Sequence, residues 1–109
     1  MTTRMKHTDV FSSIRNVAMK LKPENGKIIL FGSQARGDAH ENSDWDILVL
    51  LDKDKIEVID HDKFTYPFWE LGWEINAMIH PIVYTSKEWS TLSHTSFRDN
   101  VELYGIVLC

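Results

Sequence analysis

The sequence has few of the features that would place the chain in an oxidising compartment or a membrane. Its only cysteine is Cys109, so no disulfide can form within the chain, and we expect a reducing compartment. The longest apolar stretch, residues 45–51, is interrupted by Asp46 and is too short to span a bilayer. The first ten residues contain no apolar run typical of a secretion signal. These absences predict a cytoplasmic protein with no membrane partner.

The sequence also lacks an excess of positive charge. It has 12 Lys and Arg against 16 Asp and Glu, a net charge of −4, which argues against nonspecific nucleic-acid binding. A nucleotide held through a metal ion remains compatible with this balance. The length of 109 residues, with 43% hydrophobic and 26% charged residues, is typical of one globular domain. We therefore expect a single domain over residues 1–109.

Hydrophobic periodicity predicts the element order helix, strand, strand, helix, strand, helix. This order favours an α+β (α/β) fold, a small mixed sheet with helices packed mainly on one face. Pro67 makes the continuity of the middle helix doubtful, Gly72 is a plausible end for it, and Pro81 is expected to bulge or end the third strand. The predicted helices cover residues 8–21, part of 53–71, 87–92 and 95–104, and the predicted strands cover 27–31, 44–51 and 73–80.

A candidate phosphate-binding segment follows the first predicted strand. Gly32 allows the backbone to approach a phosphate, and the Ser33 hydroxyl adds a hydrogen-bond donor. Arg36 adds a guanidinium group four residues after Gly32. An ordinary strand-to-loop turn would explain the glycine equally well, so the segment indicates a site only in combination with other residues.

A pair of aspartates opens the second predicted strand. Asp44 and Asp46 are two residues apart, so both carboxylates project from one face of the strand. Two like charges held this close repel each other unless a cation lies between them. Mg²⁺ suits such a pair because it binds one or two carboxylates together with substrate phosphates. A solvated strand edge is the alternative explanation for the pair taken alone.

Together, these two segments resemble a known family. Gly32-Ser33, ten intervening residues and Asp44-x-Asp46 are similar to the polymerase-β-like nucleotidyltransferase superfamily. The surrounding text, FGSQARGD followed by SDWDILV, resembles its minimal nucleotidyltransferase (MNT) branch, and the close similarity covers residues 28–50. The resemblance implies the nucleotidyltransferase fold and transfer of a nucleoside monophosphate with release of pyrophosphate.

The resemblance also implies roles for single residues. Gly32 and Ser33 would bind the triphosphate, Asp44 and Asp46 would bind the metal and carry catalysis, and Arg36 would contact phosphate. It implies two Mg²⁺ ions, a nucleoside triphosphate (ATP first) and transfer of AMP. Family members of this size work with a HEPN-type protein as the antitoxin of a toxin–antitoxin pair. A homo-oligomer is a further expectation.

The sequence departs from the family where active members supply a third carboxylate. The family text there resembles LGxxVDLV, and residues 71–78 read LGWEINAM, which aligns the neutral Asn76 with the aspartate. Glu74 lies two residues earlier on the same predicted strand and is the candidate third catalytic carboxylate. His80 either lines the site from the same face or simply ends the strand. If neither residue completes the site, the protein is a catalytically degenerate module that binds a nucleotide or a partner.

Overall fold

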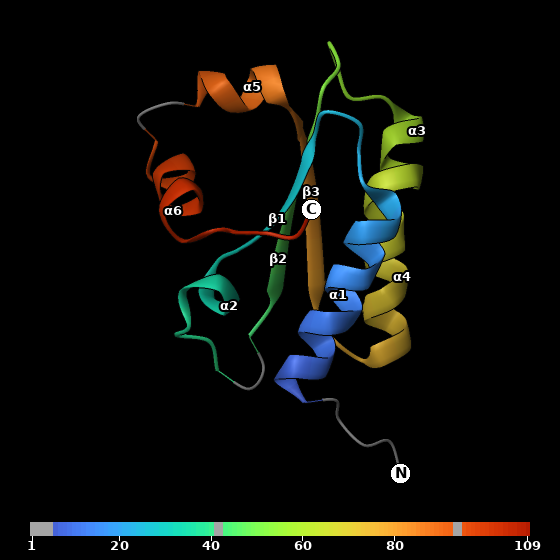
Figure 1. Ribbon diagram of the computed structural model, residues 1–109, viewed down its shortest axis with the longest axis vertical. Helices are drawn as coiled ribbons and strands as arrows, with labels where there is room; N and C mark the ends of the chain where they lie inside the picture. The colour runs from blue at the N-terminus through green and yellow to red at the C-terminus, as the bar shows by residue number, and fades with distance from the viewer. Residues whose placement is uncertain (1–5, 41–42, 93–94) are drawn as a thin grey trace.

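Four strands form one mixed sheet in the computed structural model, which describes residues 6–40, 43–92 and 95–109 (Figure 1). The strand order is β3-β2-β1-β4. β1 pairs antiparallel with β2 and with β4, whereas β2 and β3 are parallel. The expected mixed sheet and α+β class are confirmed. The strands are β1 (Lys27–Phe31), β2 (Trp45–Leu51), β3 (Ile79–Thr85) and β4 (Ile106–Val107).

The larger core lies between one face of the sheet and two helices, α1 (His7–Leu21) and α4 (Tyr66–Ile75). α1 buries Val10, Ile14 and Ala18, which recur every four residues and therefore share one side of the helix. α4 contributes Phe68, which is fully buried. Figure 1 shows α1, α3 and α4 together on this side of the sheet. The helix predicted over residues 8–21 is thus confirmed and begins one residue earlier.

A second, smaller core lies on the opposite face, beneath α5 (Ser86–Thr91) and α6 (Ser96–Tyr104) (Figure 1). Trp89 of α5 packs there against Leu48, Leu50 and Val101. A cavity of about 280 Å³ opens beside Trp89 at the end of the sheet where β1 begins and β2 ends. Helices therefore cover both faces of the sheet, whereas the sequence predicted helices mainly on one face; the two longest helices, α1 and α4, share a face.

The chain between β2 and β3 is helical for longer than predicted. α3 (Val58–Asp60), the π-helical turn η1 (His61–Thr65) and α4 follow one another without a break. Pro67 lies in the first turn of α4, directly after the π-helical turn, so the change of helical pattern coincides with the residue that cannot donate a backbone hydrogen bond. Gly72 does not end the helix: it lies inside α4 and faces the carbonyl oxygen of Ala77 too closely to carry a side chain.

The strand predicted over residues 73–80 is therefore wrong. Residues 73–75 complete α4, and Asn76 caps it in the left-handed conformation with φ 55° and ψ 48°. The strand β3 instead continues to Thr85 through Pro81. β3 is an edge strand among the described residues, and an edge strand is where a sheet tolerates a proline, because one side of the strand has no neighbour to bond. The described ranges contain no helix long and apolar enough to cross a membrane.

Candidate active site

The segment that leaves β1 turns sharply into α2 (Ser33–Arg36), a single helical turn. Gly32 precedes it with φ +77°, and Gly37 follows it with φ +84°, a region of backbone space that favours glycine. The carbonyl oxygen of Gly32 accepts hydrogen bonds from the N–H groups of Ala35 and Arg36, both at 3.1 Å. The N–H groups of Ser33 and Gln34 belong to the first turn and lie outside the helix's own bonding pattern.

The two aspartates lie at the beginning of β2, on the face of the sheet that carries α5 and α6. Asp46 has the same strand parity as Leu48 and Leu50, which belong to the second core. In the register of the sheet, Asp46 lies between Phe31 of β1 and His80 of β3. Asp44 immediately precedes the strand. The carboxylate pair is therefore flanked on one side by the end of β1 and on the other by the start of β3.

Gly32 brings the two candidate segments together. A Cβ atom built on Gly32 would collide with Oδ2 of Asp46, and the next nearest atoms also belong to Asp46. The backbone of the candidate phosphate-binding turn therefore lies directly against this carboxylate. A residue with a side chain is excluded here twice, by the positive φ and by the lack of space.

The environment of Asp46 disfavours its negative charge. Burial is the largest cause that raises the pKa of Asp46 above its ordinary value, and the neighbouring charge of Asp44 raises it further. His80 and Arg36 act in the opposite direction and lower the pKa, but less strongly. A bound cation would relieve both unfavourable effects, so the two aspartates suit a divalent metal ion.

The side chains present also indicate which ligands would complete the coordination shell of such an ion. Within the described residues, no cluster of three or more His, Cys, Asp or Glu side chains is arranged to hold a metal. Two carboxylates alone leave most coordination positions to water and substrate oxygens, which is how Mg²⁺ is commonly bound beside phosphates. The residues present therefore fit a cation that arrives with a phosphate ligand.

His80 lies beside Asp46 in the register of β2 and β3. Its Nε2 lies 3.7 Å from Oδ2 of Asp44, is buried, and has no hydrogen-bond partner in the described part of the chain. Glu74 and Asn76 do not lie on this strand: Glu74 is an exposed residue of α4, and Asn76 is the helix cap. The prediction that these two residues lie on a strand beside Asp46 is wrong, because residues 73–75 continue the helix α4.

A buried glutamine that the sequence argument missed supports the loop between α2 and β2. Gln34 is 7% exposed, and its Nε2 donates to the carbonyl oxygen of Ser43 at 3.2 Å. Its Oε1 lies 2.9 Å from Nε2 of His7 at the start of α1. Ser43 in turn accepts a 2.7 Å hydrogen bond from the backbone N–H of His40 through its Oγ. No local pattern could reveal these contacts, because His7 and Gln34 are 27 residues apart.

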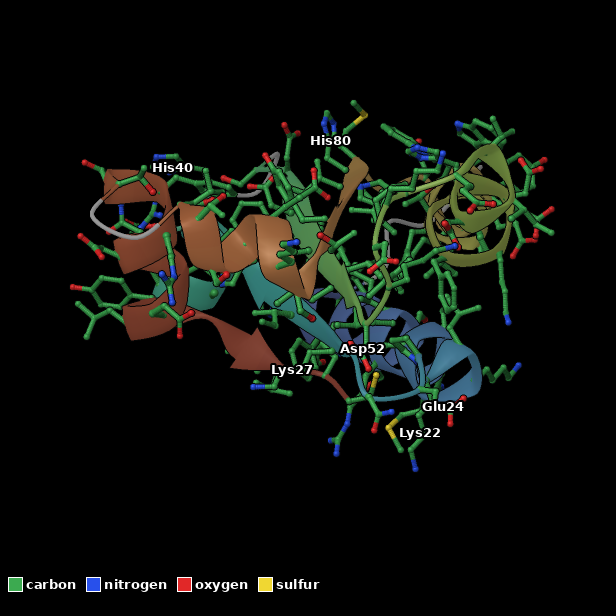
Figure 2. All side chains as sticks on the ribbon, turned by 90° about the horizontal axis from the view of Figure 1, so that it is seen from above. Lys22, Glu24, Lys27, His40, Asp52 and His80 are labelled. Atoms are coloured by element: carbon green, nitrogen blue, oxygen red, sulfur yellow. The ribbon has the colours of Figure 1, made fainter. Side chains whose placement is uncertain are left out.

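The remaining sequence candidates lie around this centre. Arg36 donates from Nε to Oδ2 of Asp38 at 3.3 Å and remains close enough to Asp46 to influence its pKa. Figure 2 shows His40 well separated from His80, and His40 is exposed. The labelled residues Lys22, Glu24, Lys27 and Asp52 gather away from His80 in the same view. The site thus comprises the turn at Gly32–Ser33, Arg36, the two aspartates and His80.

The family model of the nucleotidyltransferase domain matches residues 12–107, a span that includes the whole of this centre. This chain belongs to the nucleotidyltransferase domain family. Two relatives of Methanocaldococcus jannaschii are named as putative protein adenylyltransferases, MJ0141 and MJ0604. MJ0141 is 35% identical over 84% of this chain and 87% of its own length, and MJ0604 is 44% identical over 75% and 76%. The expected transferase class is confirmed.

Solved structures support the same assignment for this nucleotidyltransferase. A toxin–antitoxin structure with AMP-PNP superimposes with a TM-score of 0.54 at 25% identity, covering 87% of this chain and 72% of that one. A protein from Sulfolobus solfataricus named as a putative nucleotidyltransferase superimposes with a TM-score of 0.55 at 17% identity, covering 93% of this chain and 80% of that one, and shows the shared fold. The nucleotidyltransferase fold expected from residues 28–50 is confirmed.

Proposed function

We propose that this nucleotidyltransferase transfers AMP from ATP to a hydroxyl group of a partner protein. The observation that carries the proposal is the contact between Gly32 and the carboxylate of Asp46, which joins a phosphate-binding turn to a metal-binding pair. The relatives named as protein adenylyltransferases support AMP and a protein acceptor. The toxin–antitoxin neighbour with AMP-PNP supports an ATP-like donor and the role of an antitoxin. A HEPN-type toxin as the acceptor is part of the proposal and follows from the family resemblance alone.

The triphosphate would be held from two sides. The Gly32–Ser33 backbone, the Ser33 hydroxyl and Arg36 would bind its outer phosphates from the end of β1 and from α2. Asp44 and Asp46 would hold Mg²⁺, as one or two ions, against the phosphate oxygens from β2. When bound there, Mg²⁺ neutralises charge on the phosphate oxygens and on the leaving pyrophosphate.

The transfer itself is an in-line displacement. The oxygen of the acceptor hydroxyl forms a bond to the α-phosphorus, and the bond from that phosphorus to the α,β-bridging oxygen breaks. The electron pair of the broken bond leaves with pyrophosphate, and the hydroxyl proton passes to solvent. The products are the adenylylated protein and pyrophosphate. The chain contributes chiefly by positioning the phosphates and by electrostatic stabilisation.

Thermal unfolding with ATP, GTP, CTP and UTP, each with and without Mg²⁺, tests nucleotide binding. A ligand at a hundred times its Kd adds about 2.7 kcal/mol to the free energy of unfolding. For a domain of this size the melting temperature then rises by roughly 10 °C. We expect this rise for Mg²⁺ with ATP and its loss in Asp44→Asn. No rise with any of the four nucleotides would refute the assignment of the site.

One observation favours a second candidate function, a module that binds Mg²⁺ and ATP without transferring AMP. The family resemblance implies a third carboxylate on the strand next to the aspartates, whereas the residue beside Asp46 on β3 is His80. ATP labelled at the α-phosphate, incubated with the purified chain and a HEPN-type protein, separates the two functions. Label on the acceptor, absent with Asp46→Asn, supports the transferase. Stabilisation by Mg²⁺ and ATP with no label on the acceptor supports the module.

A further inference from the structure

An exposed aromatic surface lies on α4. Tyr66, Trp69 and Trp73 are three and four residues apart, so they share one side of the helix. Their exposed fractions are 48%, 38% and 68%, and Met78, 60% exposed, follows the end of the helix. The rings of Tyr66 and Trp73 meet edge to face with centroids 5.9 Å apart. We call these four residues the α4 aromatic surface. Apolar residues grouped in this way mark an interaction site more often than scattered ones do.

This surface continues into the candidate active site. The ring of Trp69 lies 5.6 Å from that of His80, and Nε2 of His80 lies 3.7 Å from Asp44 Oδ2. The carbonyl oxygen of Met78 accepts a 2.8 Å hydrogen bond from the N–H of Trp45, the residue between the two aspartates. Through His80, Trp69 therefore connects the α4 aromatic surface to the carboxylate pair.

The strand order shows which reactant meets this surface. The phosphate-binding turn extends from β1, the aspartates lie on β2, and His80 lies on β3, so the three features follow one another across the sheet. An in-line displacement requires the attacking oxygen and the leaving pyrophosphate to lie on opposite sides of the α-phosphorus. With pyrophosphate on the β1 side, the acceptor approaches from the β3 side, past His80 and Trp69.

The negative charge of α4 indicates which charge the docking segment of the acceptor would carry. α4 contains Glu70 and Glu74, both exposed, and no lysine or arginine. A segment that covers the aromatic rings and meets these carboxylates would be amphipathic, with apolar residues on one side and basic residues beside them. We propose that the α4 aromatic surface docks such a segment of the acceptor protein and thereby presents its hydroxyl to the α-phosphate. This inference rests on the proposed transfer function.

The test uses a synthetic amphipathic peptide of leucine and lysine with a single tyrosine, and a matched peptide with glutamate in place of every lysine. The full chain has four tryptophans, so nuclear magnetic resonance resolves four indole N–H signals. We expect the lysine peptide to shift the signals of Trp69 and Trp73 but not those of Trp45 and Trp89. The glutamate peptide should shift none.

Two variants locate the binding. Trp73→Ala removes the most exposed ring of the surface. It should weaken the affinity for the lysine peptide at least about tenfold, equivalent to 1.4 kcal/mol. Leu103→Ala is the matched control, because Leu103 is 72% exposed but lies on α6, and it should leave the affinity unchanged. Both variants should keep the stabilisation by Mg²⁺ and ATP.

Four results would overturn the docking proposal. A basic amphipathic segment would be excluded if the lysine peptide does not shift the indole signals of Trp69 and Trp73. It would also be excluded if the glutamate peptide binds equally well. Shifts of Trp69 and Trp73 with protein concentration alone would assign the surface to a second copy of the chain. Shifts with Mg²⁺ and ATP alone would assign it to the nucleotide base. Loss of Mg²⁺-dependent ATP binding in the unmodified chain would instead refute the proposed function, which distinguishes the two failures.

Discussion

At the scale of single residues, the surroundings of Asp46 disfavour the ionised form of its carboxyl group. Burial and the charge of Asp44 raise its pKa, so between the ordinary carboxyl pKa and this raised value the folded chain binds more protons than the unfolded chain. The stability of the protein without metal therefore falls as the pH rises through this window. At neutral pH the ionised Asp46 is a cost to folding that metal binding would offset.

Asp46→Asn should therefore raise the free energy of unfolding at pH 7 without metal, by on the order of 0.5 kcal/mol, the size typical of partly exposed charges. The gain should disappear below about pH 4, where the carboxyl is protonated in both states. Urea unfolding across this pH range measures it. Asp54→Asn is the control, because Asp54 is an exposed carboxylate outside the site. An equal gain in both variants would mean that the net charge of the chain is responsible.

Gly32 and Gly37 offer a matched pair of glycines at either end of α2. Both have positive φ, but a Cβ on Gly37 meets no atom within 4 Å, whereas one on Gly32 collides with Asp46. Gly37→Ala should lose about 1–2 kcal/mol of stability through the left-handed backbone. Gly32→Ala should lose more, because φ +77° with ψ −159° is a conformation that essentially only glycine adopts and the added Cβ meets Asp46. Only Gly32→Ala should also lose the stabilisation by Mg²⁺ and ATP in thermal unfolding. Equal nucleotide binding by the two variants would contradict the role of Gly32.

At the scale of elements, the connection between β2 and β3 shows why the sequence predicts some segments better than others. The helix α1 and the strands β1 and β2 could be predicted from the local pattern of their apolar residues. Gly72 indicated a helix end because a glycine often follows one, yet here it serves close packing against Ala77. The cap is Asn76, the other residue type that tolerates the left-handed conformation.

The capping role of Asn76 makes a prediction that separates it from a metal ligand. Asn76→Gly keeps the left-handed conformation, so we expect stability within about 1 kcal/mol of the parent and undiminished stabilisation by Mg²⁺ and ATP. Asn76→Val should lose about 1–2 kcal/mol because a β-branched side chain opposes that conformation. Thermal unfolding with and without Mg²⁺ and ATP measures both. A loss of nucleotide binding in Asn76→Gly would mean that the Asn76 side chain takes part in binding the metal or the nucleotide.

At the scale of the whole molecule, the sequence indicates candidate residues for the proposed site more readily than it indicates their arrangement in space. Gly32, Ser33, Asp44 and Asp46 could be found because they lie within one short stretch of chain. His80 and Gln34 could not be placed with equal certainty, since their roles depend on strand register and on a contact with α1. The same limit applies to the tryptophans, because helical spacing does not tell a buried ring from an exposed one.

Trp89 and Trp73 test this distinction directly. Trp89 is 5% exposed, and its indole Nε1 donates to Oε1 of Glu102 at 3.0 Å, which ties α5 to α6 over the second core. Trp89→Ala should lose about 3–5 kcal/mol, a large share of the 5–15 kcal/mol typical of a domain. Trp73→Ala should change stability by less than about 0.5 kcal/mol, since its ring is mostly in solvent. Urea unfolding of both variants measures the difference, with Trp89→Phe as a milder variant should Trp89→Ala fail to fold. Similar losses at the two positions would mean that Trp73 supports the fold, and its mutation could then no longer serve as a selective probe of docking.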